Sequence, residues 1–418
     1  MIIQILEIAL IAILCLYGIR CTFIRKDVFL LFFWVINTYH SLLASFISLG
    51  LMDNTAGFWT LLFDVDISYV CFIHIIVLCN ISFAFVEYYL INKTTKYYYD
   101  FGQISFRQID ENKNLFKILL LVFFISSGLY FLTYISMDYS TFNKIAYNSN
   151  KLITRFVQLS SCVIFYLAYK KKWVILTYFF LLFLMLSMHT TVRSLLYIVM
   201  LPAVTYYLMQ YWQKGLEFRK FAKHALLLFF ICIGLGVYMS YDKMGGVVML
   251  PDAELSTLAL NALNKYSFEI DGYRTFDTVI NFFYGLLGPF MGILGTFGLS
   301  FENPLSFSYV SAALMKGEAD LGATVGEWHC PSTIYLDFYV SWGWALPLFC
   351  ILYYSFFVVV FRLINRRPIF VALLSYQLML FLYFFIRGAV DTASGTLSYP
   401  LIYATIIYFL LSKRKRRI

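Results

Sequence analysis

Long apolar stretches run through the whole sequence and leave few folds open to it. The first, IIQILEIALIAILCLYGI, covers residues 2–19, and similar stretches recur between short polar segments. About 20 consecutive apolar residues are enough for an α-helix to cross the hydrocarbon core of a membrane. Only 13% of the 418 residues are charged and the mean hydropathy is +0.76, so a soluble fold could not cover this much apolar surface. The sequence therefore predicts an all-α polytopic membrane protein.

Length and apolarity together predict eleven membrane spans in a single integral membrane domain, 1–418. The N-terminal stretch has no charged leader and no small-residue cleavage site, so we expect a retained span there and not a signal peptide. The predicted spans cover residues 2–19, 28–50, 67–91, 115–137, 152–169, 173–189, 194–212, 225–241, 333–360, 369–386 and 396–411.

The basic residues are divided unequally between the two sets of loops. Most of the 32 lysines and arginines fall in alternate loops and in the C-terminal segment KRKRRI, whereas most acidic residues fall in the opposite set. Loops rich in lysine and arginine remain in the cytoplasm. The sequence therefore predicts an N-terminus outside and a cytoplasmic C-terminus. The KRKRRI segment is interpreted as a topology anchor, and we expect no nucleic-acid partner.

The largest loop expected on the outer side covers residues 242–332. Connections of this length are usually functional. Its segment 282–300, FFYGLLGPFMGILGTFGLS, is apolar but contains several glycines and a proline, which fits a re-entrant or interfacial segment better than a full span. The loop ends at GEWHCPSTIYLD, where polar residues directly precede the ninth span.

Three outer arginines, Arg193, Arg274 and Arg387, oppose the charge bias of that side. A guanidinium is planar, permanently charged and able to donate two hydrogen bonds to phosphate oxygens, so these residues could hold a lipid diphosphate. His189 lies four residues before Arg193 and could contact the same phosphate. The structural alternative for each arginine is snorkelling, or an ion pair such as Arg387 with Asp391.

Proton transfer has three candidates near the end of the outer loop. His329 and Glu327 lie two residues apart in a proline-containing segment, and Asp337 begins the ninth span. A histidine titrates near neutral pH, and a buried carboxylate can take a proton from a sugar hydroxyl. A solvated loop histidine and an interfacial acid are the structural alternatives. The pair Asp64 and Asp66 resembles the metal-binding motif of nucleotide-sugar enzymes, but those substrates are cytoplasmic, so we predict no metal and no cofactor.

Two segments and the layout of spans are similar to the Wzy family, the repeat-unit polymerases of bacterial O-antigen and capsule. TTVRSLLYIVMLPAVTYYL is similar to an arginine-headed span of that family. The final third, from GATVGEWHCPSTIYLDFYVSWGWALPLF to FFIRGAVDT, resembles the family's loop, glycine-containing span and arginine-ended span. The likeness covers most of the chain as a layout, but only these segments as local motifs.

The resemblance implies a GT-C-like membrane glycosyltransferase in the bacterial inner membrane. Such an enzyme joins oligosaccharide repeat units carried on undecaprenyl diphosphate into O-antigen or capsular polysaccharide at the outer face and releases the lipid diphosphate. It acts in lipopolysaccharide or other polysaccharide biosynthesis, with membrane lipid around it and a chain-length regulator as an expected partner. Arg193 and Arg387, followed by Arg274, would contact the diphosphate, while the base would be His329, Glu327 or no protein group.

Two other functions remain open from the sequence. An O-antigen ligase also uses outer arginines and a histidine near a long outer loop. A flippase or transporter should carry charged residues within its spans. Here the charges lie mostly at span ends, and Glu87, near a cytoplasmic end, is an exception.

Overall fold

The computed structural model describes part of the chain, and every regular element in that part is helical. The described residues are 2–48, 71–91, 121, 125, 208, 212, 277–298, 333–365, 368–386 and 390–414. Two compact units are distinguished. The first contains Met1–Tyr97, Met249–Phe361 and Leu380–Ser398, and the second contains Tyr98–Val248, Arg362–Met379 and Tyr399–Ile418. All contacts below lie within the first unit.

The described helices correspond to six of the predicted spans and to the apolar segment of the outer loop. They are α1 (Ile2–Arg25), α2 (Val28–Ser48), α4 (Cys71–Ile91), α14 (Asp277–Thr296), α16 (Ile334–Trp342), α17 (Leu346–Asn365), α18 (Pro368–Ile386) and α19 (Val390–Arg414). Among the described residues, Ile2–Arg25 and Leu346–Ile364 are long and apolar enough to cross a membrane. The spans predicted between residues 115 and 241 lie outside the described residues, apart from four single positions, so the count of eleven stays a prediction.

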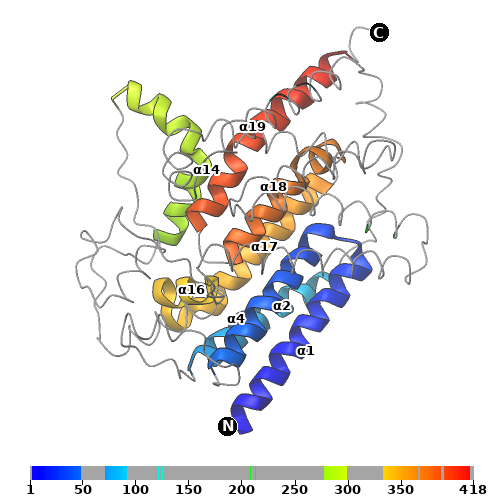
Figure 1. Ribbon diagram of the computed structural model, residues 1–418, viewed down its shortest axis with the longest axis vertical. Coiled ribbons are helices and arrows are strands. Elements are labelled where there is room, and N and C mark those ends of the chain that lie inside the picture. The colour runs from blue at the N-terminus through cyan, green and yellow to red at the C-terminus, as the bar shows by residue number, and fades with distance from the viewer. Residues whose placement is uncertain are drawn as a thin grey trace, which may run out of the picture. The chain divides into compact units, whose positions relative to one another are not determined.

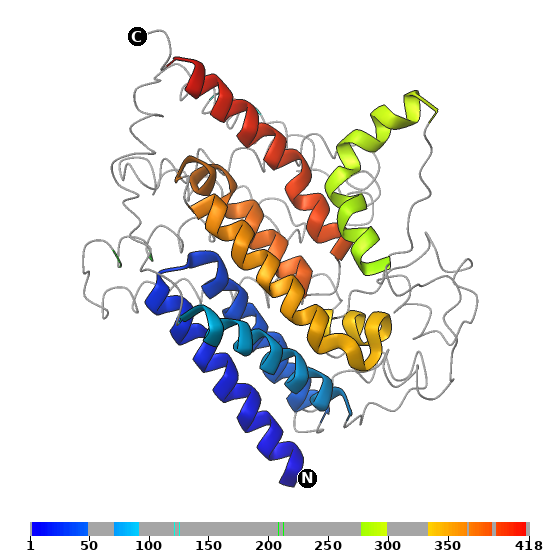
Figure 2. The same ribbon diagram turned by 180° about the vertical axis from the view of Figure 1, so that it is seen from behind.

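Helices α1, α2 and α4 lie side by side (Figures 1 and 2). The buried residues of α1 recur every three or four positions along one face, with Cys21 and Thr22 adjacent at its end, which is the pattern of a helix that packs along one seam. Gly18 lies in this seam because the Trp34 indole covers it: a Cβ built on Gly18 would lie 2.1 Å from the ring. The buried α1 residues are Ile8, Ile11, Cys15, Gly18, Cys21 and Thr22.

A tight turn joins α1 to α2. Lys26 has a φ of 60°, in the left-handed region, and Asp27 caps α2 by accepting a hydrogen bond from the Leu30 backbone N–H at 3.2 Å. Burial raises the pKa of Asp27 above its ordinary value, while the charge of Arg25 and the Leu30 N–H oppose that shift. The turn therefore has a built-in cap, but its carboxylate is removed from water.

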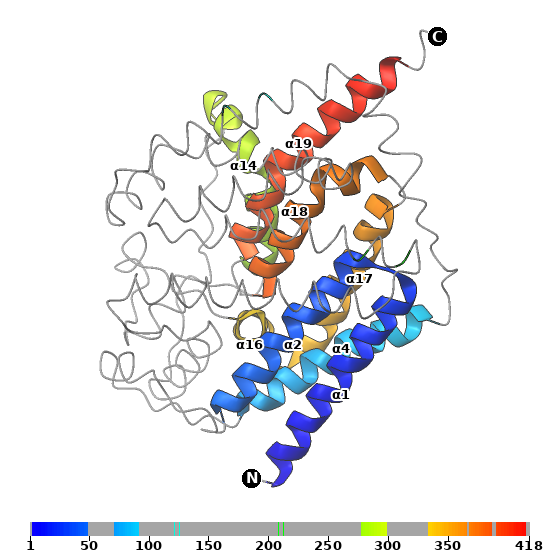
Figure 3. The same cartoon turned by 45° about the vertical axis from the view of Figure 1, so that its right-hand side comes forward.

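The ninth predicted span is divided into two helices, so the prediction of one helix over 333–360 is wrong at this point. Gly343 follows α16 with a φ of 53° and a ψ of −133°, a conformation that glycine adopts far more readily than other residues. A short 3-10 turn, Gly343–Ala345, then leads into α17, whose second residue is Pro347. Figure 3 views α16 nearly along its axis while α17 runs across the view, so the chain forms an elbow.

The apolar stretch predicted at 282–300 lies mostly within α14, a single helix of 20 residues that continues through Pro289. Whether it re-enters the membrane or lies at its surface stays a prediction. Helix α14 packs against α16, and its Phe282 meets Phe381 of α18 with ring centroids 6.2 Å apart. The elbow is therefore enclosed by α2 and α4 together with α14 and α18.

Candidate functional site

Asp337 is the sequence-predicted site residue that falls within the described part of the chain. It lies on α16 with only 1% of its surface exposed, and the Ser341 hydroxyl donates a hydrogen bond to its Oδ1 at 3.1 Å. The two residues are four apart, so one face of α16 carries both. Ser341 was missed by the sequence reasoning, although the helical spacing from Asp337 was a usable signal.

Aromatic rings surround the segment that carries Asp337. Phe338 stacks on Tyr353 of α17 with centroids 5.2 Å apart, and both rings contact Phe385 of α18, at 6.1 and 5.8 Å. The elbow thus holds the two helices against the end of α18. Asp337 is buried beside these rings, and burial strengthens any electrostatic interaction that its carboxylate makes.

The Tyr353 hydroxyl is the second polar group in this region. Its oxygen is buried and has no hydrogen-bond partner within the described part of the chain, and the Asp337 carboxylate acts on it electrostatically. A buried hydroxyl without a partner is unfavourable by about 1–3 kcal/mol, so a ligand hydroxyl could satisfy it. No sequence signal could have distinguished Tyr353 among 34 tyrosines in largely apolar surroundings.

Two of the predicted arginines are close in sequence to the termini of the helices that pack near α16, namely the start of α14 and the end of α18. Arg387 directly follows the last residue of α18, and Arg274 precedes the first residue of α14 by three positions. Both helices pack around the elbow, as the ring contacts of Phe282, Phe381 and Phe385 show. The arginine side chains themselves lie outside the described residues. So do the remaining predicted site residues, Arg193, His189, Glu327 and His329, whose roles stay predictions.

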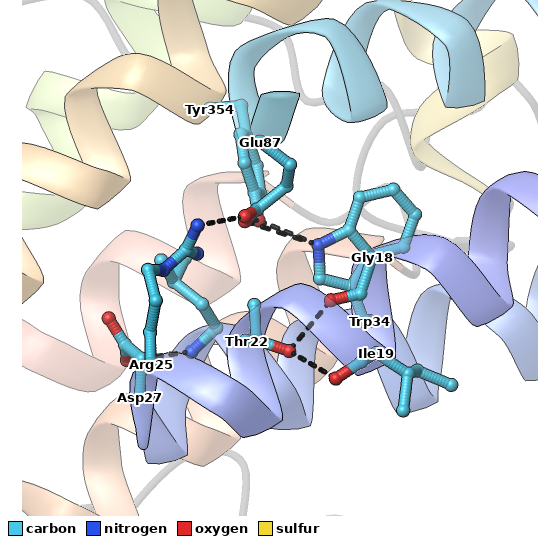
Figure 4. Close-up of polar contacts among 9 residues, drawn as sticks. Gly18, Ile19, Thr22, Arg25, Asp27, Trp34, Glu87 and Tyr354 are labelled. Carbon is cyan, nitrogen blue, oxygen red and sulfur yellow. Dashed lines mark hydrogen bonds and ion pairs between the residues drawn. The ribbon is translucent and has the colours of Figure 1, made fainter. Parts of the chain in front are cut away.

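A charged cluster lies where α1, α2, α4 and α17 meet (Figure 4). Glu87 of α4 is fully buried and forms an ion pair with Arg25 of α1, whose side chain is 10% exposed. The Tyr354 hydroxyl of α17 donates to Glu87 Oε1, and the Trp34 indole N–H donates to the Tyr354 oxygen at 2.8 Å. The cluster joins α1, α2, α4 and α17. The sequence marked Glu87 as unusual but gave no indication of its partners.

The described residues offer no obvious metal site. No group of three or more histidine, cysteine, aspartate or glutamate side chains in this part of the chain is arranged to hold an ion. Asp64 and Asp66 lie outside it. Around Asp337, the described residues provide a buried carboxylate and the hydroxyl groups of Ser341 and Tyr353, a set that can bind and deprotonate a substrate hydroxyl.

Comparison with known proteins adds no relative: no family model, curated protein or solved structure matches the chain.

Proposed function

We propose that the chain is a membrane glycosyltransferase of the Wzy type. It would join lipid-linked oligosaccharide repeat units into O-antigen or capsular polysaccharide at the outer face of a bacterial inner membrane. The donor would be a growing glycan on undecaprenyl diphosphate, and the acceptor a second lipid-linked repeat unit. The GT-C-like fold and the association with a chain-length regulator belong to this proposal.

The observation that carries the proposal is the position of Asp337. A carboxylate with 1% exposure lies on a short helix, and the helices packed beside it adjoin Arg274 and Arg387 in the sequence. A carboxylate suits deprotonation of an acceptor hydroxyl, and arginines suit a leaving diphosphate. The proposal combines these two chemistries at one end of the helices.

The relative directions of the helices support the proposed orientation. Phe29, near the start of α2, contacts Phe361, near the end of α17, with centroids 5.4 Å apart, whereas Trp34, farther along α2, donates a hydrogen bond to Tyr354, which lies closer to the start of α17. Helices α2 and α17 are therefore antiparallel. The charge distribution of the loops independently predicts opposite directions for these two spans. Both fit an elbow that enters from the outer side and a charged cluster near the cytoplasm.

The proposed reaction is balanced without a cofactor. The acceptor hydroxyl attacks the anomeric carbon of the donor, a new glycosidic bond forms, and the bond from that carbon to the diphosphate oxygen breaks. Asp337 takes the hydroxyl proton, and the electron pair leaves with the diphosphate. Arginine side chains stabilise the developing negative charge, and removal of one such donor typically lowers the rate about 100- to 1,000-fold.

The test is the banding pattern of surface glycan on a gel after deletion of the gene and return of one variant at a time. The variants are wild type, Arg193→Ala and Asp337→Asn, with Asp27→Asn as a matched control because that buried aspartate lies at the opposite end of the helices. We expect the deletion to leave a single repeat unit, and wild type and the control to restore the ladder. Arg193→Ala and Asp337→Asn should not restore it.

Two outcomes would count against the proposal. If the deletion removes every repeat unit, including the single one, the protein is a ligase or a flippase. If Asp337→Asn, present at the wild-type level in the membrane, gives a normal ladder, Asp337 is not the base.

A further inference from the structure

A closed ring of four hydrogen bonds joins α2, α4 and α16. Asn80 Nδ2 donates to Ser41 Oγ at 3.1 Å, and Ser41 Oγ lies 2.6 Å from the Tyr335 oxygen. The Tyr335 hydroxyl donates to Asn37 Oδ1 at 2.8 Å, and Asn37 Nδ2 donates to Asn80 Oδ1 at 2.7 Å. Because the single Tyr335 proton goes to Asn37, Ser41 is the donor to Tyr335. Each member then donates and accepts once within the ring.

The ring lies deep within the helices. Its four residues are fully buried, and Asn37, Ser41 and Asn80 lie near the middle of α2 and α4. The Cys15 thiol of α1 also donates to Asn80 Oδ1, at 3.4 Å. In such a low-dielectric interior, linked hydrogen bonds strengthen one another, and the loss of one partner leaves the others unsatisfied.

Tyr335 connects this ring to the candidate site. Tyr335 and Asp337 are two residues apart, so they point about 200° apart around the axis of α16. The tyrosine faces α2 and α4, and the aspartate faces away from the ring. A slip of α16 by one residue would rotate it by about 100° and would turn Asp337 to a different side. The ring therefore fixes both the depth and the rotation of α16.

The second helix of the elbow is held in the same way. Tyr354 of α17 reaches the charged cluster of Glu87, Arg25 and Trp34, and Gly343 lies between the two anchored helices. With one tyrosine hydroxyl fixed on each side of the bend, the elbow has little freedom to move against α1, α2 and α4.

We propose that Tyr335 is a positioning residue for the glycosyl transfer: its hydroxyl, held by the ring, sets the direction of the Asp337 carboxylate. The role of Asp337 in this statement rests on the proposed function, whereas the hold of the ring on α16 does not.

The experiment compares Tyr335→Phe with wild type in lipid nanodiscs. Tyr88→Phe on α4 is the matched control, since that tyrosine is 62% exposed. Amide hydrogen exchange is followed by mass spectrometry in peptides from α16 and α1. We expect exchange in α16 to be roughly tenfold faster in Tyr335→Phe, as expected for the loss of one buried hydrogen bond, with α1 unchanged. Ser41→Ala opens the same ring from α2, so it should loosen α16 equally, and the double variant should add nothing further.

The same samples are assayed with repeat units on undecaprenyl diphosphate. Turnover of Tyr335→Phe should fall about 10- to 100-fold with KM unchanged, because a misdirected catalytic group affects the chemical step and not substrate binding. If amide exchange in α16 is the same in Tyr335→Phe as in wild type, the ring does not hold α16 in place. Faster exchange with wild-type turnover would overturn the positioning role. If the wild-type protein forms no polymer, both the proposed function and the positioning role of Tyr335 are wrong. The exchange measurement would still show whether the ring holds α16.

Discussion

Replacing Glu87 with glutamine should destabilise the protein more than most single substitutions. Glutamine preserves the shape of the side chain and an oxygen that can accept from Tyr354 and Trp34. It removes the charge that faces Arg25, whose side chain is only 10% exposed, and brings an N–H donor towards guanidinium donors. The variant therefore leaves a buried cation without its partner.

The expected magnitude follows from the burial of both partners. Two unit charges 4 Å apart attract by about 4 kcal/mol at an effective dielectric constant of 20. Breaking a buried ion pair by removing one partner typically costs about 3–5 kcal/mol, and we expect Glu87→Gln to fall in that range. Adding Arg25→Met removes the stranded cation and supplies apolar contacts, so the double variant should recover most of the loss.

Equilibrium unfolding of the purified protein in mixed micelles, with increasing denaturing detergent, measures these differences. Glu7→Gln is the matched control: Glu7 is also paired across α1 and α4, with His74, but the two side chains are 18% and 40% exposed. Because both side chains of this pair are more exposed than those of Arg25 and Glu87, this variant should lower the free energy of unfolding by less than Glu87→Gln does. The reasoning is refuted if Glu87→Gln unfolds within about 1 kcal/mol of wild type, or if adding Arg25→Met recovers nothing.

Three further predictions follow from single contacts. Gly18→Ala should destabilise by about 1–3 kcal/mol or more because the new Cβ meets the Trp34 ring, whereas Gly288→Ala, with no atom within 4 Å, should be neutral or slightly stabilising in the same detergent titration. Tyr353→Phe should leave stability unchanged or higher, because no described hydrogen bond is lost, but should shorten the glycan ladder if that hydroxyl binds substrate. Asp27→Asn keeps the helix cap and removes a buried charge; because burial raises the pKa of Asp27 in the folded state, wild-type stability should fall relative to the variant as pH rises above about 4.

The positions of the apolar helices could be predicted from the sequence because a span is a local property. α1, α2, α4 and α18 lie close to their predicted ranges, since about 20 apolar residues are sufficient to define a membrane helix. The elbow was missed for a local reason as well. The predicted span 333–360 includes Gly343, yet the positive φ of this residue interrupts the helix.

The polar interior could not be predicted in this way, because its contacts join residues far apart in the chain. Tyr335 bonds with Asn37 across nearly 300 positions, and Tyr354 with Glu87 across 267. Each side chain alone looks like an ordinary tyrosine or asparagine in an apolar span. Asp337 was selected as a candidate from its place at the mouth of a span, but its neighbours Tyr353 and Phe385 come from helices whose packing no periodic pattern specifies.

The polar groups in the middle of the helices differ from those near the helix ends, and this difference bears on the role of Asp337. In the middle of α2 and α4, amide and hydroxyl side chains link the helices, and these groups satisfy one another's hydrogen bonds without a net charge. Its described Arg–Glu ion pair lies near the ends of α1 and α4, where charge costs less. Neutral groups thus form the ring that holds Tyr335 of α16. Asp337 lies on that same helix with 1% of its surface exposed, and removing a carboxylate from water is costly. The proposed transfer would use this buried carboxylate as the base for the acceptor hydroxyl.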